Sequence, residues 1–190
     1  MDRIIKAVST AITIGQKILQ DTAFQDKIRL VASEMTKAYQ ADGKVLFCGN
    51  GGSAADAQHL AAELSGRFYK DRPPLYAEAL HVNTSYVTAV ANDYSYDDIY
   101  SRLVRAMGRK GDLLIGISTS GNSRNVINAM EAAKRLGLVT VGMTGKSGGE
   151  MKKVCTYLLN VPSDDTPRIQ EAHILIGHIL CHMVEEELFA

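Results

Sequence analysis

The sequence has few cysteines, three among 190 residues, and this excludes a disulfide-rich scaffold. Cys48, Cys155 and Cys181 lie in apolar runs and show no C-x-x-C spacing. Such residues are typical of small hydrophobic side chains buried in a protein of a reducing compartment. A catalytic thiol is the alternative, and Cys48 is its candidate.

An excess of charge of one sign is also absent, because 21 Lys and Arg residues balance 21 Asp and Glu residues. We therefore expect no direct binding to nucleic acid and no membrane partner. Long hydrophobic runs are missing too. No apolar stretch approaches the roughly 18 residues needed to cross a bilayer, and the N-terminus lacks the apolar core of a signal peptide. These absences predict a cytoplasmic protein.

Short apolar runs alternate with segments of helical periodicity. Two helices, 4–19 and 25–40, are predicted before the first strand. Five strands are predicted at 44–48, 75–80, 113–117, 138–143 and 157–161. Further helices are predicted at 53–66, 84–92, 97–108, 122–136, 148–154 and 167–189. Strands that are apolar on both faces and alternate with helices indicate a parallel sheet covered on both sides, a three-layer αβα sandwich. The length is typical of one domain.

The first strand runs into the glycine-rich segment CGNGGSA, residues 48–54. In parallel sheets, ligands bind outside the carboxyl ends of the strands. Gly51 and Gly52 can adopt positive φ and admit a ligand close to the backbone. Ser53 can cap the next helix, whose free N–H groups favour an anion such as phosphate.

The third strand ends in a similar loop, STSGNS at residues 118–123. Its hydroxyl groups surround another helix N-terminus. Either loop alone is equally well explained as a simple turn, but two such loops in one sheet favour a phosphate site. Residues 49–54 also fit the dinucleotide pattern G-x-G-x-x-A. That pattern expects an acidic residue at the end of the next strand, and Glu78 lies inside it, which argues against a nicotinamide site.

Several segments together resemble the sugar isomerase (SIS) domain family: CGNGGSAADAQHLAAELSGR, AVANDYSYDDIYSR, GISTSGNSRNVI, TGKSGGEM and PRIQEAHILIGHIL. The likeness runs from about residue 40 to the C-terminus, and the two N-terminal helices fit it. The resemblance implies a single SIS domain over residues 1–190 with a flavodoxin-like, five-stranded parallel sheet. It further implies a homotetramer in which the helical pair 1–40 packs on the core and on partner subunits.

Within the family the likeness is to members that isomerise sedoheptulose 7-phosphate. It implies conversion to D-glycero-D-manno-heptose 7-phosphate through an enediol, the first step towards the heptoses of bacterial lipopolysaccharide. Such a reaction needs a base and an acid but no organic cofactor. The alternative is a non-catalytic relative that binds the replication initiator and regulates chromosome replication. That relative lacks the equivalents of Glu63 and His178, so their presence here favours the isomerase over it and over a sugar-phosphate sensor.

His59 and Glu63 are four residues apart, so they share one face of the predicted helix 53–66, where an ordinary surface pair is the alternative. The resemblance implies that Glu63 is the catalytic base and His178 its acid partner. His173 and His182 are expected to be structural or exposed. The positions that match the family's substrate-binding residues are Asn50, Gly51, Gly52, Ser53, His59, Glu63, Asn92, Asp93, Ser118, Thr119, Ser120, Ser123 and Gln170.

The resemblance also implies a divalent metal, Zn²⁺, bound once per subunit by His59, Glu63, Gln170 and His178. Imidazole and carboxylate are suitable zinc ligands, whereas a side-chain amide is uncommon. Gln170 and His178 are eight residues apart, about 12 Å along a continuous helix. They can share an ion only if their side chains converge, if the helix begins after Gln170, or if two subunits contribute.

Overall fold

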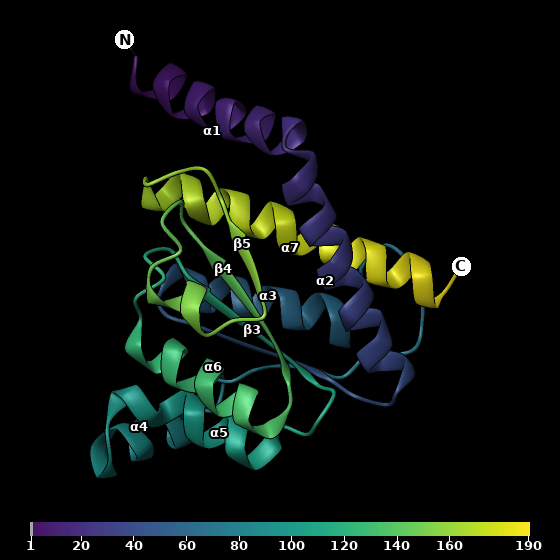
Figure 1. Cartoon of the computed structure of the whole chain (residues 1–190), viewed down its shortest axis with the longest axis vertical. Helices are drawn as coiled ribbons and strands as arrows, with labels where there is room; N and C mark the ends of the chain where they lie inside the picture. The colour runs from purple at the N-terminus through teal and green to yellow at the C-terminus, as the bar shows by residue number, and fades with distance from the viewer. Residues whose placement is uncertain (1) are drawn as a thin grey trace.

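A computed structural model describes residues 2–190 and contains a five-stranded parallel sheet between two layers of helices (Figure 1). The strand order is β2-β1-β3-β4-β5. The predicted three-layer sandwich is therefore confirmed. The strands are β1 Val45–Gly49, β2 Ala77–Ala79, β3 Leu113–Ser118, β4 Val139–Thr144 and β5 Tyr157–Asn160.

The helices agree with the predicted segments except in two places. The segment predicted at 148–154 forms only a short 3₁₀ helix, because Gly148 and Gly149 have φ of 72° and 50°. The segment predicted at 97–108 is divided into a 3₁₀ turn and an α-helix. The helices are α1 Arg3–Gln20, α2 Thr22–Gln40, α3 Gly52–Ser65, α4 Thr84–Asp93, η1 Tyr96–Asp98, α5 Ile99–Met107, α6 Arg124–Leu136, η2 Glu150–Lys153 and α7 Thr166–Leu188.

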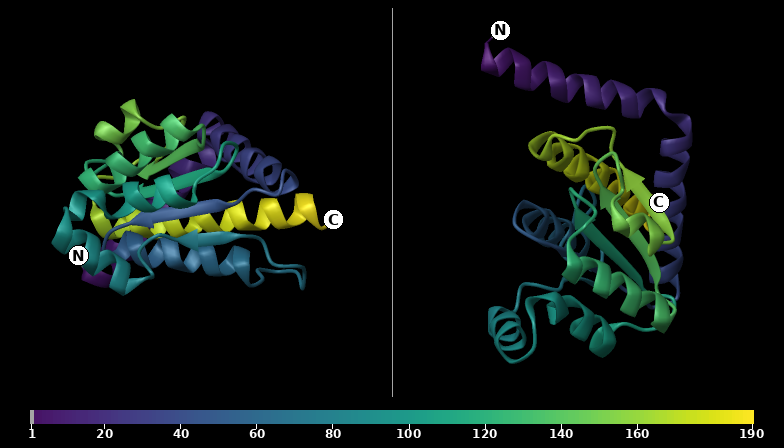
Figure 2. Two further views of the ribbon diagram at one scale, coloured as in Figure 1. Left: turned by 90° about the horizontal axis from the view of Figure 1, so that it is seen from below. Right: turned by 60° about the vertical axis from the view of Figure 1, so that its left-hand side comes forward.

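Successive residues of each strand point to opposite faces of the sheet, and so the sheet has two separate apolar cores. In β1, Val45 and Phe47 belong to the core shared with α2, α3 and α7. Leu46 and Cys48 belong to the core shared with α4, α5 and α6. Figure 2 shows the two layers on either side of the sheet.

Helices α3 and α7 lie against each other in the same layer. A Cβ atom added at Gly177 of α7 would collide with the side chain of Leu60 in α3, and one added at Gly52 would collide with the amide of Gln170. Since residue 52 faces 170 and residue 60 faces 177, the two helices run side by side in the same direction. Glycine at these positions therefore lets the Leu60 and Gln170 side chains lie directly against the backbone of the neighbouring helix.

The C-terminal end of α3 is fixed to α7 by a buried ion pair. Arg72 donates from Nε to the Glu185 carboxylate at 3.0 Å, and its guanidinium also donates to the carbonyls of Glu63 and Leu64 at 2.9 and 2.8 Å. The Arg72 and Glu185 side chains are only 2% and 1% exposed. Burial alone raises the pKa of Glu185, but hydrogen bonds from three backbone N–H groups and Arg72 outweigh it and lower that pKa.

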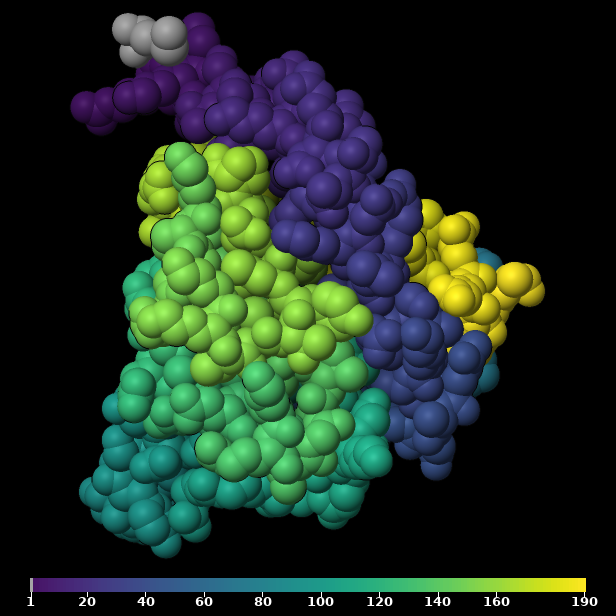
Figure 3. Space-filling model, in the orientation of Figure 1, coloured from purple at the N-terminus to yellow at the C-terminus, as the bar shows by residue number. Residues whose placement is uncertain are grey.

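Helix α1 projects from the body of the molecule (Figures 1 and 3). Of its apolar side chains only Ile14 and Ile18 are buried in the core. The adjacent face of the helix carries an exposed apolar stripe made of Ile4, Ile5, Val8, Ile12 and Leu19, which are 53–74% exposed. Monomeric proteins rarely leave such a continuous apolar surface in water.

All three cysteines are free, and Cys48 and Cys181 are buried as predicted, whereas Cys155 is partly exposed. Burial raises the pKa of the Cys48 thiol to about 12, which removes it as a candidate nucleophile. Within residues 2–190, no helix combines the length and apolar character needed to cross a membrane.

His173 of α7 is structural, as predicted, because it is wholly buried. Its Nε2 atom lies 3.2 Å from the carbonyl oxygen of Thr144 in β4. Burial lowers the pKa of His173 from 6.5 to about 4, although the Thr144 carbonyl acts in the opposite direction. The buried ring is thus neutral at physiological pH.

This depressed pKa predicts a pH-dependent loss of stability. As pH falls below 6.5, His173 binds a proton in the unfolded chain but not in the folded one, so the unfolding free energy decreases until about pH 4. His173→Gln keeps an N–H donor for Thr144 and cannot titrate. Between pH 7.5 and pH 5 the unfolding free energy of the wild-type protein, measured with urea, should decrease by about 2 kcal/mol more than that of this variant.

The matched control is His182→Gln, which replaces an exposed histidine of the same helix. As pH falls, its unfolding free energy should decrease by the same amount as that of the wild-type protein. Parallel pH profiles for wild type and His173→Gln would contradict the assignment of the buried neutral histidine.

Candidate active site

Two loops that follow neighbouring strands meet at the carboxyl edge of the sheet. Strands β1 and β3 are paired with Gly49 opposite Ile117, so the loops after them begin side by side. Asn50 and Asn125 then exchange two hydrogen bonds between their amides, each of 2.9 Å. The hydroxyl of Tyr96 donates to the Asn50 Oδ1 atom at 3.1 Å. The loops therefore form one rigid surface.

The first loop, residues 49–53, differs from its prediction at the helix start. Gly51 is the N-cap of α3 and has φ of 57°, as expected for a glycine that makes a tight turn. Ser53 lies within the first turn of α3 and is 4% exposed, so the predicted capping by Ser53 is wrong. Gly52 does not have a positive φ. Because it has no side chain, the Gln170 amide can lie directly against its backbone.

The second loop, residues 118–123, carries its hydroxyl groups as predicted. The Oγ atoms of Ser118 and Ser123 are 2.9 Å apart, and Ser120 Oγ accepts a hydrogen bond from the backbone of Asn122 at 3.1 Å. Thr119 and Ser120 line a cavity of about 270 Å³, whose other polar residues include Lys146, Ser163, Asp164 and Thr166. This cavity has the donors and the positive charge that a phosphate group requires.

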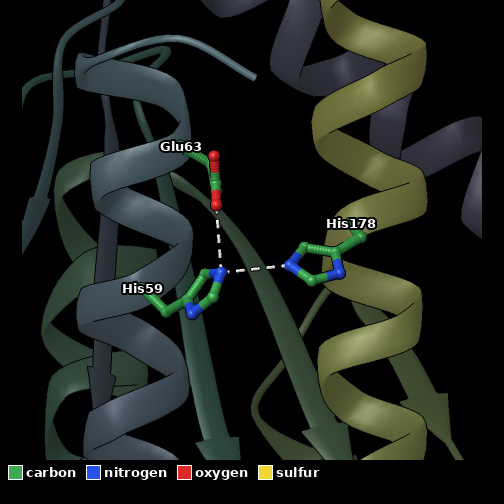
Figure 4. A group of neighbouring side chains, drawn as sticks. All are labelled: His59, Glu63 and His178. Carbon is green, nitrogen blue, oxygen red and sulfur yellow. Dashed lines mark hydrogen bonds and ion pairs between the residues drawn. The ribbon is translucent and has the colours of Figure 1, made fainter. Parts of the chain in front are cut away.

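Three side chains from α3 and α7 converge farther along these two helices (Figure 4). The Nε2 atom of His59 lies 3.0 Å from the Glu63 carboxylate and 3.1 Å from the Nε2 atom of His178. Their ligating atoms all lie within 4.8 Å of one another. The separations of 3.0 and 3.1 Å are close to the separation of about 3.3 Å between neighbouring ligands of a tetrahedral zinc ion. The residues therefore fit a metal ion of this kind.

Gln170, the other predicted metal ligand, is held elsewhere. Helix α7 is continuous from Thr166, so the possibility that it begins after Gln170 is wrong. The Gln170 amide lies against Gly52 at the start of α3, while His178 meets His59 farther along the same pair of helices. Within this chain Gln170 contacts the first loop instead of joining the three ligating groups.

Asn92 and Asp93 lie exposed at the end of α4, where Asn92 donates a hydrogen bond to the Asp93 carboxylate at 2.9 Å. They precede η1, and the contact of this segment with the first loop is made by Tyr96. Neither residue hydrogen-bonds to the two loops or to the three ligating groups within residues 2–190.

Three residues of the site were missed by the sequence analysis. Asn125 follows the predicted loop by two residues, and Asp56 lies three residues before His59 on the same helix, so spacing could have indicated both. No comparable signal marks Tyr96. Asp56 Oδ2 is buried and has no hydrogen-bond partner within residues 2–190, and burial raises the pKa of Asp56 while the nearby His59 acts to lower it.

The site can therefore perform two kinds of chemistry. Its loops supply hydroxyl groups and helix N-termini for an anion, and its helices supply a carboxylate and two imidazoles for proton transfer or metal binding. Glu63 and His59 have side chains that are 25% and 49% exposed, so a substrate can reach them.

Comparison with known proteins relates this chain to a described family. The SIS domain family matches residues 12–145. The phosphoheptose isomerase of Clostridium acetobutylicum is 53% identical over 182 residues, which cover 96% of this chain and 93% of that protein. The structure of the phosphoheptose isomerase of Neisseria gonorrhoeae aligns with a TM-score of 0.90 and 42% identity over 97% of both chains.

A second solved structure, a phosphoheptose isomerase from Francisella tularensis, aligns with a TM-score of 0.93 and 36% identity over 97% of both chains. Both the sequence relatives and these structures span nearly the whole chain, including its two N-terminal helices. The chain therefore belongs to the SIS domain family and, within it, to the phosphoheptose isomerases.

Proposed function

We propose that this isomerase converts sedoheptulose 7-phosphate into D-glycero-D-manno-heptose 7-phosphate, which supplies the heptoses of bacterial lipopolysaccharide. The observation that carries the proposal is the convergence of Glu63, His59 and His178 on α3 and α7, since α3 begins at the first of the two phosphate-type loops. A purely regulatory SIS protein needs the loops but has no use for an acid and a base at this position. The curated relatives at 50–57% identity are named phosphoheptose isomerases, which supports the same substrate.

The phosphate of the substrate binds at the loops, where hydroxyl groups and helix N-termini attract its negative charge. The groups that contact it are Ser53, Ser118, Thr119, Ser120 and Ser123, with the backbone of Asn50, Gly51 and Gly52. Asn92, Asp93 and Gln170 contact the sugar hydroxyls. The carbonyl end of the sugar then extends along α3 towards Glu63, which lies roughly 15 Å from the first turn of that helix.

Glu63 acts as the base. Its carboxylate removes a proton from C1 of the ketose, and the electron pair of that C–H bond forms the C1–C2 double bond of an enediol. His178 protonates the C2 oxygen as the double bond forms. Glu63 then returns its proton to C2 while the proton of the C1 hydroxyl passes back to His178, which leaves an aldose. His59 contacts the sugar oxygens and holds Glu63 in position through their 3.0 Å interaction.

The resident cofactor is one Zn²⁺ per subunit, and His59, Glu63 and His178 would hold it. A bound metal ion would polarise the sugar oxygens. A carboxylate bound to zinc would be a weaker base, so Glu63 would act as the base in its unbound form. Gln170 becomes a fourth ligand only if its side chain leaves Gly52 or a second subunit supplies it.

The protein forms a homotetramer in the cytoplasm. The apolar stripe of α1 supports the tetramer, because burial of this surface against another subunit removes it from water. Residues 1–40 thus act both as part of the single SIS domain and as its contact with partner subunits. The three free cysteines agree with a reducing compartment.

Substitution of the two catalytic groups tests the proposed reaction. Glu63→Gln cannot accept a proton and His178→Ala cannot donate one, so each should reduce kcat by about 10²–10⁴-fold. Product formation from sedoheptulose 7-phosphate is the measurement, and the melting temperature reports the fold. The controls are Glu131→Gln on α6 and His182→Ala one turn further along α7, which should stay within twofold of wild type. Near-normal turnover by Glu63→Gln would show that the base is another group.

The tetramer is tested at the apolar stripe. Val8→Lys together with Ile12→Lys places two charges on this surface, and we expect the variant to dissociate because a buried charge is strongly unfavourable. Light scattering should give four times the chain mass for wild type and a smaller mass for the variant. Thr13→Lys, on another side of α1, should remain tetrameric. A monomeric wild-type protein at micromolar concentration would refute the proposal.

Zinc removal tests the cofactor. Ligand binding to the folded state stabilises it by about 2.7 kcal/mol at a concentration of 100 Kd. For a chain of this length, zinc should therefore raise the melting temperature by roughly 5–10 °C. His59→Ala should abolish the increase and His182→Ala should preserve it. Equal melting temperatures with zinc and with a chelator, combined with full activity in the chelator, would leave no role for the metal.

A further inference from the structure

The segment that follows α3 is held in one conformation by Glu185. The Glu185 carboxylate accepts hydrogen bonds from the backbone N–H groups of Phe68, Tyr69 and Lys70 at 3.2, 2.7 and 2.9 Å. The same carboxylate accepts the bond from Arg72 described above. Four donors on one buried carboxylate leave residues 68–72 little freedom, because each bond that is broken would leave a buried polar group without a partner.

This segment presents the ring of Phe68 to His178. The two rings are stacked, with centroids 5.5 Å apart and an interplanar angle of 29°. The His59 ring lies 5.1 Å from His178 at an angle of 52°. His178 is therefore enclosed by Phe68 and His59, and its ring is oriented so that Nε2 is directed at His59 (Figure 4).

The neighbouring Tyr69 has the same backbone anchor but a different target. Tyr69 is 69% exposed, and its ring packs edge-on against His182 with centroids 4.8 Å apart, besides its tilted contact with the Phe68 ring at 4.4 Å. Two consecutive aromatic residues on one segment thus contact two histidines one turn apart on α7. Only Phe68 contacts the histidine that meets Glu63 and His59.

We infer that Phe68 is a positioning residue for His178, and that the Arg72–Glu185 pair holds Phe68 in place. An imidazole on a helix can adopt several rotamers, and one of them directs Nε2 at His59 and Glu63. The stacked Phe68 ring occupies the space into which the imidazole would otherwise turn. Aromatic contacts of this kind contribute favourable free energy beyond that of their buried area. This is enough to change the population of a rotamer severalfold.

The inference rests on the proposed role of His178 as the acid, and it predicts a specific kinetic effect. Phe68→Leu keeps an apolar side chain but removes the stacked ring, so kcat should fall about tenfold because the acid is misaligned. KM should remain within twofold, since Phe68 is remote from the phosphate loops. Phe68→Tyr keeps the aromatic ring and should keep the wild-type kcat. If Phe68 were needed only for folding, kcat of the folded protein would not depend on whether residue 68 is aromatic.

Tyr69→Leu is the matched control. It removes the adjacent aromatic ring on the same anchored segment, and kcat should remain within twofold of wild type. If Phe68→Leu fails to fold, as judged by its melting temperature, Phe68→Met takes its place with the same expected kcat.

A second readout is independent of turnover. In ¹³C-edited NMR spectra of histidine-labelled protein, the His178 Cε1–H signal, assigned with His178→Gln, experiences the ring current of Phe68. The signal should move in Phe68→Leu and keep its position in Phe68→Tyr and in Tyr69→Leu. This measurement remains valid if Glu63→Gln retains full activity and the proposed reaction fails. A kcat within twofold of wild type for Phe68→Leu, or an unmoved His178 signal, would overturn the inference.

Discussion

The site depends on the close, parallel contact of α3 with α7. Glycine allows this contact twice, at Gly52 beside Gln170 and at Gly177 beside Leu60. The buried Arg72–Glu185 pair fixes a third point, at the C-terminal end of α3. Leu60 and Gly177 are the immediate neighbours of His59 and His178, so the spacing of the two helices directly sets the distance between the two imidazoles. A side chain at position 177 would separate them.

The ion pair contributes geometry more than stability. Two buried charges lose much of their attraction to the cost of leaving water, so such pairs add little net free energy to folding. Such a pair fixes the orientation of the segments that it joins. The Arg72 guanidinium donates hydrogen bonds to backbone carbonyls at the end of α3, and the Glu185 carboxylate accepts them from backbone N–H groups of residues 68–70. An apolar pair would pack as well but would permit the helices to slide. The pair therefore defines where Glu63 lies relative to α7.

Three different parts of the molecule carry the two loops, the His59–Glu63–His178 group and the exposed apolar stripe. The carboxyl edge of the sheet carries the two loops proposed to bind phosphate, and the Asn50–Asn125 hydrogen bonds join the first loop to the start of α6. The α3–α7 layer carries the groups proposed for acid–base chemistry, which stay partly exposed beside the apolar core. Helix α1 carries the apolar stripe and contributes only Ile14 and Ile18 to the core. Rigid elements hold the chemical groups, and the exposed helix remains available for association.

The sequence by itself determined the sheet, the order of helices and strands, and the two loops, because these depend on local periodicity and on glycine and serine at strand ends. It also paired His59 with Glu63, since residues four apart on a helix lie next to each other on the same face. The tertiary structure decided which residues of different elements meet: His178 joins this pair, and Gln170 contacts Gly52 instead. It also showed that Gly51, rather than Ser53, is the N-cap of α3. These outcomes depend on how closely two helices approach each other, and that distance is set by atoms far apart in the chain.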